Sequence, residues 1–278
     1  MLIVCNNKMI PKIVHQTYKT EATIPKHWQE SYLSWKGLEP HGWQYMFWDD
    51  AKMRDLIAKN YSWFLNQYDS YPKVIQRVDA WRLFALYHYG GLYTDLDIVC
   101  KPDKFLPYFE VIQNETVVLP KTKTGNGVEG QDLSNCFMLS EPHNEFWPHV
   151  WKTLRNPYKL FPYKATLSYI SPYYGVLFTS GPGIIADSYY TYENKSSIYV
   201  LPAPLIQPLD DSKPKPHDTR ESLVRIIEGN SWHPKSVSFW RSFGFFDKYA
   251  KVILGVLLGM CMIVIVVLSV KLHQANRE

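Results

Sequence analysis

Residues 75–97 read IQRVDAWRLFALYHYGGLYTDLD, and this stretch decides the fold. Across residues 72–89 the apolar side chains recur at spacings of three and four, which is the period of an amphipathic α-helix. The pair Gly90-Gly91 follows at once and favours the end of that helix. Residues 92–99 (LYTDLDIV) then predict a β-strand, so the stretch indicates a helix, a tight break and a strand in succession.

Two pairs of charged residues in this stretch are candidate chemical groups. Asp95 and Asp97 are two residues apart, so in an extended segment both face one way and can reach one divalent cation, or one cation and a ribose hydroxyl. Asp79 and Arg82 share a helix face, where they form either a surface ion pair or a polar ligand site beside the metal. Ligands of open α/β sheets bind at the carboxyl ends of strands, which favours one site for all four residues.

The rest of the chain continues this alternation of strands and helices. Further strands are expected at 10–18, 43–48, 116–119, 136–139 and 197–201, and further helices at 25–38 and from Pro182. Alternating strands and helices predict an α/β fold around a mostly parallel sheet. We expect it to form a single domain over residues 1–245.

Composition excludes several classes of protein. A chain of 278 residues with 46% hydrophobic and 20% charged residues is neither disordered nor a short disulfide scaffold. The net charge of +4 is spread along the chain and forms no basic stripe, so nucleic acid is not an expected partner. Four scattered cysteines without a C-x-x-C pair give no zinc site.

The C-terminal region, residues 246–278, predicts a membrane anchor. Residues 252–270 contain no charged side chain, and as a helix they would span about 28 Å, close to the thickness of a bilayer core. Aromatic residues precede this span, and Lys251 and Lys271 bracket it. We therefore expect a single-pass membrane protein.

The side of the membrane on which the domain lies stays open. The N-terminus lacks a signal-peptide core, and more basic residues precede the span than follow it, which favours a cytosolic domain. The glycosylation acceptor patterns that begin at Asn60, Asn114 and Asn194 favour a lumenal one.

Residues 75–97 resemble the signature of glycosyltransferase family 32, whose members use sugar nucleotides and share a DXD motif and a GT-A fold. The opening IPKIVHQTYKT and residues 68–72, 135–143, 180–183 and 230–233 also resemble family segments. Together they are similar to the catalytic subunits of inositol-phosphoceramide mannosyltransferases, over essentially all of residues 10–240.

The resemblance implies a role for each matching residue. It implies that Asp97 binds a divalent metal, usually Mn²⁺, and that Asp95 contacts the ribose and the metal shell. Asp79 and Arg82 would hold the donor sugar and complete the catalytic set with the two DXD carboxylates. The remaining implied positions are His15, Gln16, Tyr18 and Trp232 at the nucleotide sugar, and Ser231 and His233 at the metal.

The implied activity is a retaining, metal-dependent transfer of mannose from GDP-mannose to a membrane lipid, inositol phosphoceramide. The resemblance also implies a Golgi or related endomembrane location and is compatible with a membrane regulatory subunit. Two enzyme alternatives remain: a mannosyltransferase for protein-linked glycans, and a glycosyltransferase with another donor. A membrane-anchored carbohydrate-binding protein is the alternative that is not an enzyme.

Overall fold

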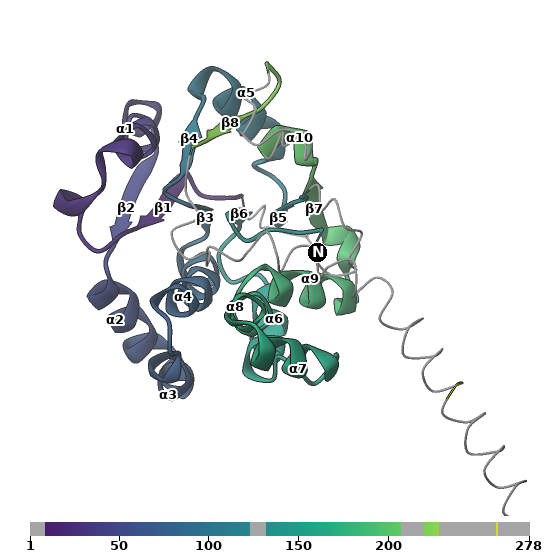
Figure 1. The fold of residues 1–278 in the computed structure, drawn as a ribbon. Helices are drawn as coiled ribbons and strands as arrows, with labels where there is room; N and C mark the ends of the chain where they lie inside the picture. The colour runs from purple at the N-terminus through teal and green to yellow at the C-terminus, as the bar shows by residue number, and fades with distance from the viewer. Residues whose placement is uncertain (1–8, 123–131, 207–219, 228–259, 261–278) are drawn as a thin grey trace, which may run out of the picture.

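The computed structural model describes residues 9–122, 132–206, 220–227 and 260. Its strands are β1 (Ile13–Thr17), β2 (Gln44–Trp48), β3 (Gly91–Thr94), β4 (Ile98–Cys100), β5 (Val117–Pro120), β6 (Phe137–Ser140), β7 (Ile198–Leu201) and β8 (Val224–Ile226). Its α-helices are α1 (Gln29–Lys36), α2 (Asp50–Asn60), α3 (Ser62–Ser70), α4 (Val74–Tyr89), α5 (Pro102–Ile112), α6 (Phe146–Arg155), α7 (Tyr163–Ile170), α8 (Pro172–Thr179), α9 (Pro182–Thr191) and α10 (Ala203–Ile206). Figure 1 shows their arrangement.

The main sheet has six strands in the order β2-β1-β3-β6-β5-β7. Neighbouring strands pair in parallel, except that β6 runs antiparallel to both β3 and β5. Strands β4 and β8 form a separate two-stranded sheet. The predicted α/β fold around a mostly parallel sheet is confirmed.

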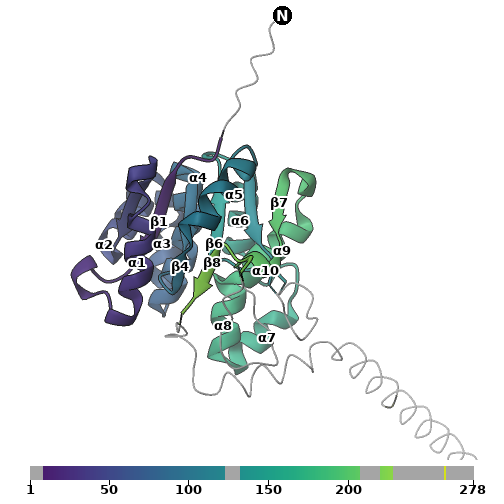
Figure 2. The same ribbon diagram turned by 90° about the horizontal axis from the view of Figure 1, so that it is seen from above.

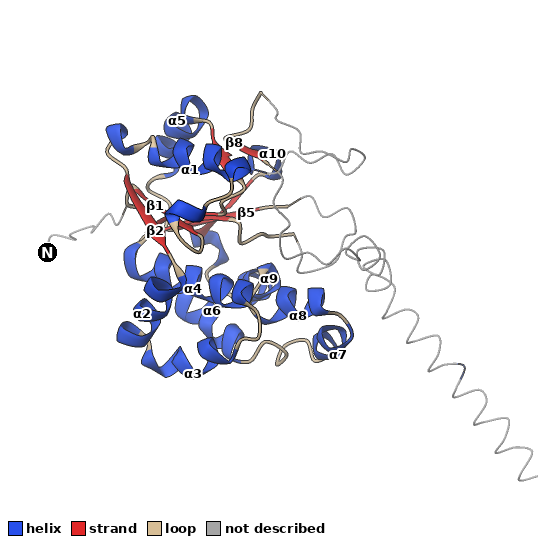
Figure 3. Ribbon diagram, turned by 60° about the vertical axis from the view of Figure 1, so that its left-hand side comes forward, coloured by secondary structure: helices blue, strands red, loops and turns tan. Residues whose placement is uncertain are grey.

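Helices cover both faces of the main sheet (Figure 3). Helices α1, α5 and α10 lie on one face, and α2, α3, α4, α6 and α9 lie on the other. Each face of the sheet has its own hydrophobic core, and successive residues of a strand point into the two cores alternately. In β3, Leu92 packs with α1 and α5, whereas Tyr93 packs with α4. A strand buried on both faces is therefore apolar throughout, as the sequence of β5 is.

Helix α4 ends where the glycine pair predicts. Gly90 has φ of 67° and its N–H donates to the carbonyl of Leu86 at 3.0 Å, which closes the last turn of the helix. Gly91 has φ of 89° and starts β3 against β1, where a Cβ would lie 2.6 Å from the carbonyl oxygen of Ile13. Only glycine fits this close approach.

The prediction of one continuous strand over 92–99 is wrong. Strand β3 ends at Thr94, a turn follows, and β4 begins at Ile98 in the second sheet. The carbonyl of Ile98 accepts hydrogen bonds from Ser31 Oγ and from Trp35 Nε1 at 2.7 Å, and these contacts from α1 hold β4 away from the main sheet. Asp95 and Asp97 therefore lie in a turn between two sheets.

Much of the predicted C-terminal region lies outside the described residues. This applies to the predicted span 252–270 apart from Met260, and to the boundary between 1–245 and 246–278. In the part of the chain that the structure describes, no helix combines the length and the apolar character needed to cross a membrane.

Candidate active site

Asp95 begins the turn at the carboxyl end of β3. Its backbone N–H donates to the carbonyl of Cys136 at 2.9 Å, which ties the turn to the antiparallel neighbour β6. Its side-chain oxygen Oδ1 accepts two hydrogen bonds, from Tyr93 Oη at 2.6 Å and from Arg82 Nη1 at 3.1 Å. The side chain is 32% exposed, and no donor to its Oδ2 is present among the described residues. Within the described residues, Oδ1 of Asp95 is thus fixed by the protein and Oδ2 accepts no hydrogen bond.

Arg82 connects the helix α4 with this turn. Its side chain is only 2% exposed, and its guanidinium lies over the ring of Tyr93 at 4.2 Å from the centroid. Besides Asp95, Nη1 donates to the carbonyl of Asn135 at 2.8 Å, and Nη2 pairs with Asp79 Oδ1 at 3.0 Å. The planar fork of arginine suits such simultaneous contacts. The surface ion pair that the sequence left open for Asp79 and Arg82 is not what the structure contains, because both residues are buried.

Asp79 is the second carboxylate on this guanidinium. It accepts from Asn135 Nδ2 at 2.9 Å and from Ser180 Oγ at 3.5 Å, in addition to Arg82. Burial raises the pKa of Asp79 to about 6, while the charge of Arg82 and these hydrogen bonds act in the opposite direction. Side chains from α4, from the start of β6 and from the start of α9 thus meet at one point.

Asp97 differs from its partner in the turn. It forms no ion pair with a cationic side chain within the described residues, and only its own backbone hydrogen bond and, more weakly, the charge of Arg82 favour its charged form there. Burial, followed by the negative charge of Asp95, raises the pKa of Asp97 to about 7. A cation beside the two carboxylates would offset the free-energy cost of charging Asp97. Asp97 is therefore the group of the site that a bound cation would stabilise most.

The two DXD carboxylates fit a divalent metal. In the described ranges, no cluster of three or more His, Cys, Asp or Glu side chains could hold an ion alone. Hard cations such as Mg²⁺ are often bound by one or two carboxylates together with substrate phosphates, and Mn²⁺ also prefers oxygen ligands. Asp97 and the free Oδ2 of Asp95 supply this kind of partial shell.

The end of β1 reaches the same edge of the sheet. Gln16 Nε2 donates to the carbonyl of Asp95 at 3.2 Å, and its Oε1 accepts from Tyr45 Oη at 3.0 Å. Tyr18 follows β1 and its ring packs edge-on against Trp28, with centroids 5.7 Å apart. The structure therefore brings Gln16 into contact with the DXD turn, whereas the contacts of Tyr18 are with Trp28 and, through its backbone N–H, with the carbonyl of Trp48 in β2.

His15 lies deeper in the sheet. Its Nδ1 accepts from Trp48 Nε1 at 3.1 Å, so its Nε2 carries the proton and donates to the carbonyl of Gly90 at 2.9 Å. Burial lowers the pKa of His15 to about 4, and the ring is neutral at physiological pH. Both ring nitrogens are occupied by protein partners from β2 and from the end of α4.

Three predicted site residues, Ser231, Trp232 and His233, lie outside the described residues. Conversely, the structure adds Asn135 and Ser180, to which the sequence assigned no role. Both occur in segments that resemble the family, and this was the one signal that pointed to them.

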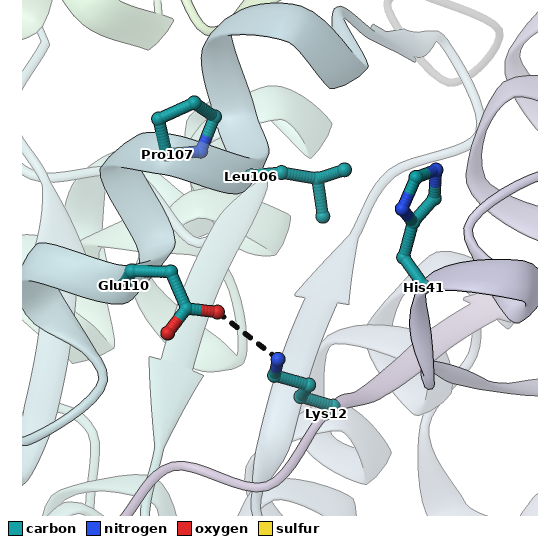
Figure 4. A pocket seen from close by; sticks show the side chains of 5 residues that line it. All are labelled: Lys12, His41, Leu106, Pro107 and Glu110. Carbon is teal, nitrogen blue, oxygen red and sulfur yellow. Dashed lines mark hydrogen bonds and ion pairs between the residues drawn. The ribbon is translucent and has the colours of Figure 1, made fainter.

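A pocket elsewhere on the molecule is not part of this site. It is lined by Lys12, His41, Leu106, Pro107 and Glu110, with Lys12 and Glu110 paired at 3.0 Å (Figure 4). Lys12 precedes β1, whereas Asp95 follows β3, which runs parallel to β1. The pocket therefore lies at the amino ends of these parallel strands, and the DXD turn lies at their carboxyl ends.

Comparison with known proteins finds a matching family and similar proteins. Residues 25–118 match the family described as the glycosyltransferase sugar-binding region containing DXD motif. The chain is 32% identical over 228 residues to inositol phosphoceramide mannosyltransferase 1 of Schizosaccharomyces pombe, covering 81% of this chain and 62% of that protein. It is 32% identical over 260 residues to mannosyl phosphorylinositol ceramide synthase CSH1 of Saccharomyces cerevisiae, covering 88% and 62%. The chain thus spans about three fifths of the length of these relatives.

The alignment with a solved structure, the PaToxG glycosyltransferase, covers 66% of this chain and 70% of that chain, at 14% identity and a TM-score of 0.42. The family match spans α4 and the DXD turn, which carry Asp79, Arg82, Asp95 and Asp97. Residues 25–118 of this chain are therefore similar to the sugar-binding region of the DXD-containing glycosyltransferases.

Proposed function

We propose that this protein transfers mannose from GDP-mannose to inositol phosphoceramide, with a divalent cation, most simply Mn²⁺, at the DXD turn. The observation that carries the proposal is the asymmetry of the two carboxylates: Asp95 is held by hydrogen bonds from Arg82 and Tyr93, whereas Asp97 forms no ion pair among the described residues. The names of the relatives, which are mannosyltransferases of inositol phosphoceramide, support the choice of sugar and acceptor.

The donor is held at the carboxyl edge of the sheet in this proposal. Asp97 and Asp95 Oδ2 would hold the cation, whose charge would offset the negative charge that develops on the leaving diphosphate. Asp79 and Arg82 orient the sugar, and Asn135 fixes both of them. Gln16 and Tyr18 lie where the nucleotide passes the end of β1. His15 lies deeper in the sheet and stabilises this edge through its hydrogen bonds with Trp48 and Gly90.

The reaction needs little acid–base machinery. The bond between the sugar C1 and the diphosphate oxygen breaks, and a bond between C1 and the acceptor oxygen forms on the same face of the sugar, so the configuration is retained. The acceptor hydroxyl gives its proton to an oxygen of the departing diphosphate. Burial keeps the pKa of Tyr93 well above its ordinary value, so its hydroxyl remains a donor to Asp95 throughout.

The segment beyond the described residues completes the proposal. Ser231 and His233 would add to the metal shell, and Trp232 would close over the diphosphate. The apolar residues 252–270 would anchor the enzyme in an endomembrane of the Golgi type, where the lipid acceptor resides, and a membrane regulatory subunit is compatible with this arrangement.

A donor and acceptor screen tests the proposal. Membranes containing the full chain are supplied with Mn²⁺, radiolabelled GDP-mannose and inositol phosphoceramide, and the lipid fraction is counted; UDP-glucose serves as the control donor. We expect labelled mannosyl lipid from GDP-mannose that disappears with a chelator. Release of GDP without labelled lipid would refute the acceptor, and transfer from UDP-glucose alone would refute the donor. The absence of transfer from every donor tested would favour the alternative that the protein binds carbohydrate and is not an enzyme.

A further inference from the structure

The helix α7 exposes large apolar side chains to the surroundings. Tyr169 is 93% exposed, and Tyr163 on the same helix and Leu160 just before it are 43% and 46% exposed. We call these three residues the α7 surface. Scattered apolar residues are normal on protein surfaces, but three within ten residues of chain form a concentrated group.

The same part of the chain carries positive charge only. Residues 146–186 contain no Asp or Glu, whereas they contain Lys152, Arg155, Lys159 and Lys164. Lys164 is buried and pairs with Asp187 at 2.7 Å, so it does not act on the exterior. The other three basic side chains are exposed. Of these three, Lys159 adjoins the α7 surface, since it directly precedes Leu160, whereas Lys152 and Arg155 belong to α6.

This surface is firmly connected to the candidate active site. Helix α7 packs against α8, and α8 is tied to α4 by Gln76 Nε2, which donates to Thr179 Oγ1 at 2.8 Å. The residue after α8 is Ser180, which donates to Asp79. Helix α8 has eight residues and is about 12 Å long. Figure 2 shows α7 and α8 on the side of the molecule away from the start of β1.

We infer that the α7 surface lies against a lipid bilayer that carries anionic headgroups. Tyrosine has an apolar ring and a polar tip, and it is enriched where hydrocarbon meets water. Basic residues near an anionic membrane surface add about 1 kcal/mol each, or about fivefold in the docking equilibrium. A protein partner would need acidic groups to match this surface, whereas anionic lipids supply them all along the membrane.

The contact goes beyond the transfer reaction, since binding to lipid requires neither donor nor metal. It has a consequence for the enzyme, because α7 packs against α8 and the residue after α8, Ser180, contacts Asp79. A bilayer at the α7 surface would hold the DXD turn close to the level of the headgroups. The open edge of the sheet would then face an acceptor that never leaves the membrane.

Fluorescence quenching in reconstituted full-length protein tests the inference. An environment-sensitive fluorescent amino acid is placed at the exposed position of Thr166 in α7, and in a second protein at Val111, which is 75% exposed on α5. Vesicles contain phosphatidylcholine with or without phosphatidylinositol, and a lipid with a nitroxide near the headgroup is the quencher. Both proteins carry the same anchor, so any difference between them reports the orientation of the domain.

We expect quenching at position 166 in vesicles with phosphatidylinositol, and much less at position 111. Raising the salt to 1 M, where the Debye length is about 3 Å, should weaken it. Lys159→Gln should lower the ratio of docked to undocked protein by about fivefold, and Tyr169→Ser should lower it further. Equal quenching at both positions, or none at 166, would overturn the inference. A fluorescence shift at 166 that depends on protein concentration in detergent would assign the surface to a second copy of the chain instead.

Discussion

Arg82 donates to Asp95 at 3.1 Å across thirteen positions of sequence, and this contact joins the helix α4 to the DXD turn. The same guanidinium pairs with Asp79 at 3.0 Å. Asp79 and Asp95 therefore both pair with the buried guanidinium of Arg82, whereas Asp97 forms no ion pair with it.

Replacing Arg82 tests whether its fork positions the site. Arg82→Lys keeps the charge but cannot contact Asp79, Asp95 and the carbonyl of Asn135 together. We expect transfer to fall by about 100-fold, the order of loss caused by a small misplacement of reacting groups. Arg82→Ala leaves the buried Asp79 and the partly exposed Asp95 uncompensated and should lower the free energy of unfolding by about 3–5 kcal/mol, mainly through Asp79. Transfer assays and urea unfolding measure the two effects; normal turnover in Arg82→Lys would refute the positioning role.

His15 should make stability depend on pH. Burial lowers its pKa to about 4 from an ordinary 6.5, so between these values the unfolded chain binds more protons than the folded one. Stability is therefore complete above pH 6.5 and is lost as the pH falls toward 4, by about 3 kcal/mol in all. Urea unfolding at several pH values, for the wild type and His15→Gln, isolates this contribution. A stability difference between the two proteins that stays constant from pH 7 to 4 would contradict it.

The buried pair of Lys164 and Asp187 should be structural. Both side chains are 3% exposed, and Lys164 also lies 4.8 Å from the ring centroid of Phe178. Asp187→Asn leaves a buried ammonium uncompensated and should lower the free energy of unfolding by about 3–5 kcal/mol. The exposed pair of Lys59 and Asp55 is the matched control, because Asp55→Asn should cost about 0.5 kcal/mol or less. Similar costs for the two substitutions would contradict the expected role of burial.

Two glycines with similar backbone angles should respond differently to a methyl group. Gly42 and Gly91 have φ of 82° and 89°, so each Ala variant should lose about 1–2 kcal/mol through left-handed strain. A Cβ at position 42 meets nothing within 4 Å, whereas at position 91 it meets the carbonyl oxygen of Ile13 at 2.6 Å. Gly91→Ala should therefore lose about 1–3 kcal/mol more than Gly42→Ala. Equal melting temperatures of the two variants would contradict this expectation, because β1 and β3 could then move apart at position 91 without loss of stability.

The sequence predicted the parts of the fold that local patterns determine. Helix α4 follows from its apolar spacing, and its end follows from Gly90 and Gly91, whose φ angles only glycine adopts easily. The α/β alternation also follows from local signals. The separation of β4 from β3 could not be predicted, because it depends on pairing with β8, which lies more than a hundred residues further along the chain.

The candidate site was predictable in its residue types and less so in its contacts. Asp79, Arg82, Asp95 and Asp97 are four of the residues that the sequence selected, and the structure places them around one point. Their environment depends on Asn135 and Ser180, which approach from distant segments. No local pattern says that Arg82 is buried or that Asp95 is compensated while Asp97 is not.

The most direct test of the account is mannosyl transfer by Asp97→Asn at saturating Mn²⁺, beside the wild type and Asp55→Asn. Asparagine keeps the size of the side chain and removes the charge that would hold the cation. We predict that Asp97→Asn folds normally but transfers mannose about 100-fold more slowly or worse, and that Asp55→Asn matches the wild type. Wild-type transfer by Asp97→Asn would contradict the central claim, because the cation would then not depend on this carboxylate.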